Sequence, residues 1–206
     1  MRSSLLFFLL LAGLAGPAPA RATSVIPPSF PELVAEAEAI YRGRVSRVEA
    51  RRVEHSDGGS VIKTFVTVAV ERVLKGPEQK EVTLEFLGGT VGDETLTVTG
   101  IPVFARGDRE IVFVQKNGIQ LCPLVALMHG RYRLKRDESG AREYVARDNG
   151  IPLTDTAEVE LPMMALPGQV RTARAAATPA DALSSFDFET RVVVEVKRRS
   201  ARPQQN

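Results

Sequence analysis

The chain has 206 residues, of which 44% are hydrophobic and 25% charged, and its formal net charge at pH 7 is +2. This composition suits one globular domain with some unstructured ends, and it excludes collagen-like, coiled-coil and strongly disordered chains. A single cysteine, Cys122, cannot form an internal disulfide, so we expect apolar packing alone to hold the fold together.

Residues 1–22 have the three parts of a secretory signal peptide: a positive start, an apolar core at residues 5–15, and Ala20-Arg21-Ala22 as a small-x-small cleavage site. A membrane anchor is the alternative, but the apolar run is shorter than the ~20 residues that cross a bilayer. Cleavage removes Arg2 and Arg21 and no acidic residue, which leaves the mature chain formally neutral. We therefore expect an exported protein, periplasmic or extracellular, with no stable membrane insertion after signal removal and no nucleic-acid binding.

The start of the mature chain is predicted to be extended and then helical. Thr23 to Pro28 is extended because Pro27-Pro28 fixes φ and blocks a helix. Ser29 with Glu32 three residues later has the spacing of a capping box, and a proline in the first turn loses no hydrogen bond. The pattern predicts a helix from Ser29 to about Ala37.

Three alternating runs then predict antiparallel strands: residues 39–53, 61–74 and 81–86. Asp57-Gly58-Gly59 marks a hairpin between the first two runs, and Lys75-Gly76-Pro77-Glu78 ends the second. The first run carries a row of arginines on its polar side, which could bind phosphate or an acidic partner. A solvated strand face explains the same row, and we favour that interpretation.

A loop with three glycines, residues 88–93, invites comparison with phosphate-binding loops. A phosphate-binding loop needs Lys-Ser/Thr after its last glycine and a helix beyond it, whereas residues 94–99 alternate as another strand. We therefore predict a flexible or bulged turn here.

Further strands are expected at residues 110–115, 119–124, 131–134 and 143–145, with a hairpin at Asn117-Gly118. Six to eight strands at short spacing predict a closed or stacked sheet, since closure or stacking removes exposed edges. After Pro152 the pattern loosens into a connector at residues 154–178. Thr178-Pro179-Ala180-Asp181 has the composition of a helix cap, and residues 188–196 fit a helix slightly better than a strand.

The sequence therefore divides into a signal peptide (1–22), an antiparallel β-barrel domain (23–153) and a loosely attached C-terminal extension (154–206). Its titratable residues show no catalytic pattern. His55 and His129 lack the ligand spacing of a zinc site, and Cys122 has no neighbour that would lower its pKa. We expect no enzyme activity, no catalytic residue, no metal and no cofactor.

The order of features resembles the inhibitory domain of tissue inhibitors of metalloproteinases and the wider netrin-like OB-fold group. The resemblance rests on the extended segment 23–28, the helix 29–37, the strand 40–48, and above all Val73-Leu74-Lys75-Gly76-Pro77-Glu78 followed by residues 82–86. It continues to about residue 136. The disulfides of the animal family are missing, and the chain is more similar to disulfide-free exported bacterial relatives of this fold.

The resemblance implies an OB-like barrel and a binding site at the mature N-terminus. In the animal inhibitors, the amine and carbonyl of the first mature residue chelate the zinc of the protease, and the next residue enters its specificity pocket. These positions correspond to Thr23 and Ser24, with Val25, Ile26 and Pro27 along the cleft.

We therefore expect a monomeric, exported binding module whose partner is a secreted zinc metalloprotease. The alternative is a structural or envelope-associated OB-fold protein with no protease target. An enzyme that shows no recognisable motif is the third interpretation.

Overall fold

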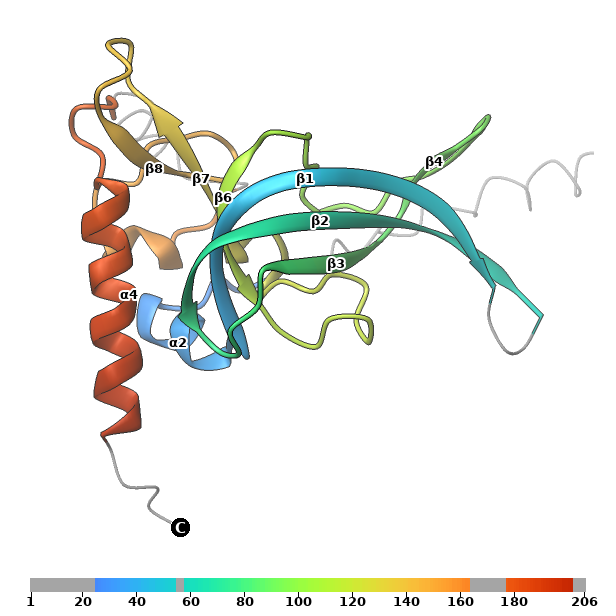
Figure 1. Cartoon of the computed structure of the whole chain (residues 1–206), viewed down its shortest axis with the longest axis horizontal. Helices are drawn as coiled ribbons and strands as arrows, with labels where there is room; N and C mark the ends of the chain where they lie inside the picture. Colours follow the sequence, from blue (N-terminus) through green and yellow to red (C-terminus); the bar gives the residue numbers. More distant parts are fainter. Residues whose placement is uncertain (1–24, 55–57, 164–176, 202–206) are drawn as a thin grey trace, which may run out of the picture.

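The computed structural model describes residues 25–54, 58–163 and 177–201 of a mainly β protein (Figure 1). The strands are β1 (Ala39–Glu54), β2 (Ser60–Lys75), β3 (Glu81–Leu87), β4 (Gly89–Val91), β5 (Glu94–Leu96), β6 (Arg109–Val114), β7 (Arg131–Arg136) and β8 (Glu143–Arg147). The helices are α2 (Phe30–Glu36) and α4 (Ser185–Ser200), and the 3-10 turns are η2 (Leu127–Gly130) and η3 (Thr156–Glu160). One antiparallel sheet has the order β3-β2-β1-β6-β7-β8, and β4 pairs separately with β5. The mainly antiparallel β class is confirmed.

β1 and β2 form the long hairpin that the two alternating runs predict. They pair antiparallel as far as Glu54 and Ser60, on either side of the turn. The register shifts between Ile40 and Tyr41, between Arg42 and Gly43, and between Val45 and Arg47. Bulges of this kind bend and twist a hairpin. In Figure 1 the hairpin is an arch that projects well beyond the rest of the sheet.

The glycine-rich stretch after β3 turns the chain into a second hairpin. Gly88 and Gly89 have φ of +102° and +133°, where side chains are strained. A Cβ at Gly88 would lie 2.6 Å from the carbonyl oxygen of Leu96, and one at Gly89 would lie 2.4 Å from Oγ1 of Thr64. Glycine therefore lets the β4–β5 hairpin approach β2 closely. The expected strand at residues 94–99 ends early, at Leu96.

The expected return strand Ile119–Leu124 is wrong. Asn117 does not form a two-residue hairpin, because its side chain bonds to the edge of β3. Its Oδ1 accepts the backbone N–H of Glu85 at 3.0 Å, and its Nδ2 donates to the carbonyl of Thr83 at 2.8 Å. These bonds satisfy backbone groups that an edge strand would otherwise leave unpaired. Residues 115–124 thus form a loop along β3.

The expected closed barrel is not observed among the described residues. Among the described residues the hydrogen-bonded strand order is open, with β3 and β8 at its two ends. The β6-β7-β8 part is a meander, as the last predicted hairpin implies. The 115–124 loop reaches β3 through one backbone bond, from Leu87 N–H to the Leu121 carbonyl at 2.7 Å. Residues 115–124 therefore contact the edge of β3 as a loop and not as a strand.

The C-terminal helix α4 belongs to the core, so the expectation of a loosely attached C-terminal segment is wrong for this helix. Its N-cap is Ser184, whose Oγ accepts the N–H of Asp187, and not the cap predicted at residues 178–181. Phe188 and Val192 are completely buried against the sheet. In Figure 1 the helix stands beside β7 and β8, close to α2.

Two apolar clusters lie on opposite faces of the sheet. The first packs α2, α4 and η3 against β6 and β7, and its centre holds Phe113, Tyr132 and Phe188. The second lines the inside of the β1–β2 arch and includes Leu84 and Phe86. Burial on both faces is what the doubly apolar β6 run predicts.

Candidate functional site

Three of the predicted partner-binding residues lie among the described residues, just before α2. Val25, Ile26 and Pro27 lie outside any helix or strand, and Ile26 is 87% exposed. Thr23 and Ser24 lie outside the described residues. The next residue, Pro28, is buried. An exposed apolar side chain thus stands directly beside a fixed point of the fold.

The first turn of α2 fixes the base of this segment. Oε2 of Glu32 accepts both the backbone N–H of Ser29 at 2.9 Å and its hydroxyl at 2.7 Å, which confirms the predicted capping box. These hydrogen bonds lower the pKa of the Glu32 carboxyl. One turn later, Leu33 and Val34 are fully buried. The N-terminal segment therefore leaves the fold from a capped and packed helix end.

The Lys-Gly-Pro turn, on which the family resemblance chiefly rests, holds the other end of α2. Nζ of Lys75 donates to the carbonyls of Val34 at 2.8 Å and Ala35 at 3.1 Å, where a cation also complements the helix dipole. Gly76 has φ +94°, and a Cβ there would lie 2.8 Å from the Cβ of Ala39. The motif therefore positions α2, and through it the segment before it.

Helix α4 supports α2 from the side. Nη2 of Arg199 donates to the carbonyl of Pro31 at 2.6 Å, and the rings of Phe30 and Phe188 lie 5.8 Å apart. Both contacts join residues that are more than 150 positions apart in sequence. No local sequence pattern predicts these contacts between α4 and α2.

Cys122 and His129 are both buried, and burial shifts the pKa values of both side chains. Burial raises the pKa of the Cys122 thiol to about 12, so it stays protonated and is a poor nucleophile. Burial and the nearby guanidinium of Arg147 lower the pKa of His129 to about 4. Cys122 lies in the 115–124 loop rather than in the expected strand.

The most deeply buried charges form a cluster around Arg131, which is 2% exposed. Its guanidinium donates to both carboxylate oxygens of Glu110, at 3.2 and 2.6 Å, to Asp148 at 2.9 Å, and to Asp108 at 3.1 Å. Burial raises the pKa of Glu110 to about 7 although Arg131 opposes this. The cluster ties β6, β7 and the neighbouring loops together, and its donors are used within the protein.

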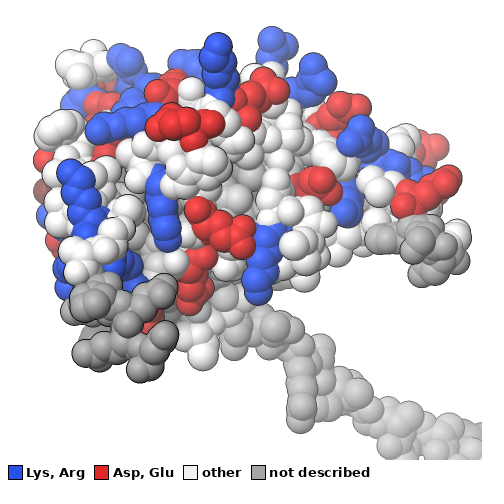
Figure 2. Space-filling model, turned by 60° about the horizontal axis from the view of Figure 1, so that its bottom comes forward, with Lys and Arg blue, Asp and Glu red and all other residues white. Residues whose placement is uncertain are grey.

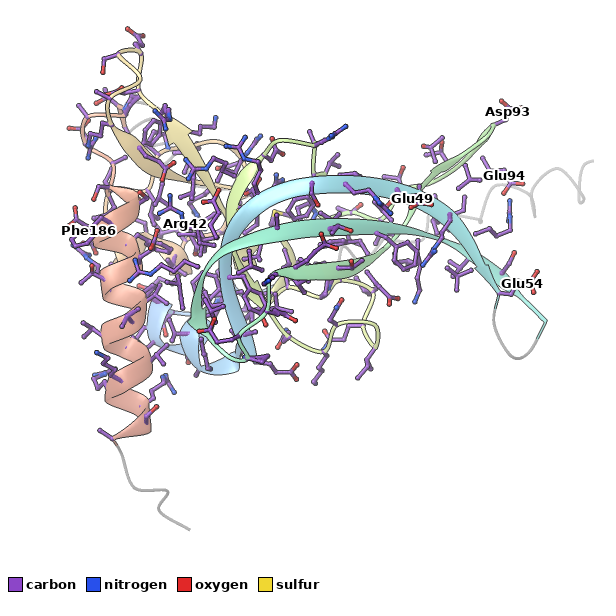
Figure 3. The ribbon with its side chains drawn as sticks, viewed as in Figure 1. Arg42, Glu49, Glu54, Asp93, Glu94 and Phe186 are labelled. Atoms are coloured by element: carbon purple, nitrogen blue, oxygen red, sulfur yellow. The ribbon has the colours of Figure 1, made fainter. Side chains whose placement is uncertain are left out.

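The arginine row predicted on β1 is divided among separate contacts. Arg42 lies between β1 and α4 (Figure 3) and pairs with Glu189 at 2.5 Å and Glu143 at 2.8 Å. The guanidinium of Arg51 stacks over Phe65 at 3.8 Å, and Arg52 pairs with Glu94 at 2.5 Å. These arginines therefore make contacts within the protein that stabilise the fold. On the face shown in Figure 2, basic and acidic side chains are interspersed.

The described residues contain neither a membrane-spanning helix nor a metal-binding cluster. No helix there has the length and apolar character needed to span a bilayer. Among the same residues, no three His, Cys, Asp or Glu side chains are grouped so that they could hold a metal ion.

The structure also contains a cavity that the sequence did not indicate. It measures about 370 Å³ and lies between the inner face of the β1–β2–β3 arch, the β4–β5 hairpin and residues 97–104. It is formed by segments that meet only when the glycine corner folds back. No motif marks it, because strand residues at its floor look like ordinary core positions.

Comparisons with known proteins give no identification. No protein-family model matches the sequence, and a search of curated proteins finds no significant match.

Proposed function

We propose that this protein is an exported binding module that acts through its mature N-terminus, with a secreted zinc metalloprotease as its partner. The observation that carries the proposal is the exposed apolar residue Ile26, in a segment rooted in the capped and packed helix α2. Because Pro28 and α2 fix the C-terminal end of this segment, it loses less conformational entropy on binding than a chain end that is free on both sides would.

The proposal includes an OB-like arrangement of the sheet. Support comes from the bent β1–β2 hairpin with β3 on one side and β6 on the other. The 115–124 loop also bonds to β3 at the edge of the sheet. The hydrogen bonds from Lys75 to the end of α2 give the lysine of the Lys-Gly-Pro turn a structural role.

The proposed chemistry depends on where the signal peptide is cut. Cleavage after Ala22 gives Thr23 a free amine, whose pKa near ~7.7–8.0 leaves it partly neutral at physiological pH and able to donate to zinc. The carbonyl of Thr23 completes a five-membered chelate. A retained Ala22 would move the amine away from this position.

The test combines mass spectrometry of the exported protein with inhibition assays on a co-exported zinc protease. Protein that starts at Thr23 should inhibit, and protein that retains Ala22 should not, with the same unfolding temperature for both. Equal inhibition by both forms, or none by either, would replace the inhibitor proposal with a structural or envelope-associated module.

A pair of matched variants tests the segment itself. Ile26→Glu should weaken inhibition at least tenfold without loss of stability, since this side chain is 87% exposed. Ile119→Glu is the control, because Ile119 is 82% exposed and lies on the 115–124 loop. Equal effects of the two substitutions would argue against a role for the segment.

A further inference from the structure

The cavity beneath the β4–β5 hairpin is uncharged throughout. Its walls consist of aliphatic and aromatic side chains, glycines and threonines, and none of its lining residues carries a charge. Its volume of about 370 Å³ is at the lower end of the ~300–1,000 Å³ typical of small-molecule sites. With ~30 Å³ for each water-sized atom, it has room for about a dozen non-hydrogen atoms.

Three of the four threonines that line the cavity have hydroxyl partners within the protein. The hydroxyl of Thr64 donates to the carbonyl of Gly88 at 2.7 Å, and the hydroxyls of Thr90 and Thr95 bond to each other at 3.0 Å. Ligands that carry many hydrogen-bonding groups would lose their bonds to water here without replacement. This chemistry disfavours sugars, nucleotides and ions, and favours an aliphatic chain.

The walls of the cavity are held in place by contacts with one another and with Arg131 behind them. The ring of Phe104 lies 5.2 Å from that of Phe86 and 4.0 Å from the guanidinium carbon of Arg131. Nη1 of Arg131 also donates to the carbonyl of Val103 at 2.7 Å. The buried cluster around Arg131 therefore fixes the wall that carries Val103 and Phe104, and a fixed cavity binds with less ordering cost.

Apolar side chains also mark the cavity mouth. Val103 is 87% exposed and Val48 is 38% exposed, although both line the cavity. Large apolar side chains at a mouth favour the entry of an apolar chain from water. The free end of such a chain would remain in solvent and could carry a polar group.

We propose that this cavity is a binding site for one neutral aliphatic chain of a small amphiphile. The site is separate from the N-terminal segment and does not depend on the proposed protease partner. The proposal rests on the preformed, uncharged cavity with its exposed apolar mouth.

Binding can be measured with the full mature protein and the neutral fluorescent probe 1-naphthylamine, which is small enough for the cavity, with decanol as the aliphatic competitor. We expect saturable binding of one probe per chain and displacement by decanol but not by glucose. A protein that shows no saturable binding, or whose probe is not displaced by decanol, would overturn the proposal. The second result would leave an apolar protein segment as the better candidate for this cavity.

Matched variants locate the site. Val48→Phe extends a side chain into the mouth and should weaken probe binding at least tenfold. Val194→Phe changes a valine that is 59% exposed on α4, and it should leave binding unchanged. Val103→Asp supplies a second, independent change at the mouth on an exposed residue. Unfolding temperatures confirm that each variant is folded, and unchanged binding in both mouth variants would contradict the assignment.

Discussion

Glu110 and His129 are buried titratable side chains, 0% and 5% exposed, and both make stability depend on pH. Burial raises the pKa of Glu110 from 4.5 to about 7, so between these values the native state holds a proton that the unfolded chain has released. Stability from Glu110 is therefore greatest at low pH and falls as pH rises toward 7. Burial lowers the pKa of His129 from 6.5 to about 4, and its contribution falls as pH drops through this range. The two effects oppose each other between pH 4.5 and 6.5.

Single variants should separate the two effects. Relative to the unsubstituted protein, Glu110→Gln should gain stability as pH rises from about 4.5 to 7, and His129→Gln should gain as pH falls from 6.5 toward 4. Urea unfolding at closely spaced pH values measures both differences. Differences that stay constant with pH would show that neither group titrates as its burial implies.

Phe86 offers a direct test of the β3 register. Its side chain is 2% exposed and packs on Phe104, so Phe86→Ala should lower the free energy of unfolding by ~3–5 kcal/mol. Phe186→Ala is the matched control, because Phe186 is 69% exposed on α4 and should change stability by less than about 0.5 kcal/mol. Urea unfolding measures both. A near-neutral Phe86→Ala would place this side chain on the other face of the strand.

Side-chain burial was predictable from the sequence for apolar residues and not for charged ones. Of the four residues that the period of two places in the core, Leu74, Leu84 and Phe86 are buried, and Val82 is half-buried. Arg42 was expected on a solvated face, yet it pairs with Glu189, which is 147 residues away in the chain. The alternation along a strand shows only which residues share a face. It does not show that α4, from a distant part of the sequence, covers the polar face of β1.

At the scale of elements, Glu189 anchors α4 to the sheet. Its carboxylate is 1% exposed and accepts hydrogen bonds from Arg42 and from Arg72 at 2.8 Å. Glu189→Gln should lower the free energy of unfolding by ~1–3 kcal/mol, because the guanidinium of Arg42 would lose a charged acceptor under the helix. Glu49→Gln is the control, since Glu49 is exposed on β1 (Figure 3). If urea unfolding gives equal values for the two variants, α4 is not anchored by this contact.

The elements themselves were predictable where one local signal decided the conformation. The capping box of α2 and the alternation of β1 and β2 both gave correct positions. The hairpin predicted at Asn117-Gly118 is wrong because the side-chain amide of Asn117 hydrogen-bonds to the backbone at the edge of β3. Whether a side chain bonds to the unpaired backbone groups of an edge strand depends on the tertiary structure. A two-residue motif carries no information about it.

For the whole molecule, the candidate N-terminal segment was predictable only in outline. Ile26 stands out as an apolar residue before Pro27-Pro28, but its exposure depends on how α2 is packed against Lys75 and α4. The cavity was not predictable, because it requires the β3–β4 corner, the arch and residues 97–104 to meet.

The two apolar clusters on opposite faces of the sheet should unfold together, since β6 contributes Phe113 to one and Val112 to the other. The chain has no tryptophan and three tyrosines, all in strands, so tyrosine fluorescence reports on the sheet and circular dichroism at 222 nm reports strongly on the helices. Phe188→Ala should shift both thermal transitions downward by the same amount, because removing this ring from the α4 face weakens a core shared with the sheet. If the dichroism transition moved to lower temperature while the fluorescence transition stayed in place, α4 would be a separately unfolding extension, as first expected from the sequence.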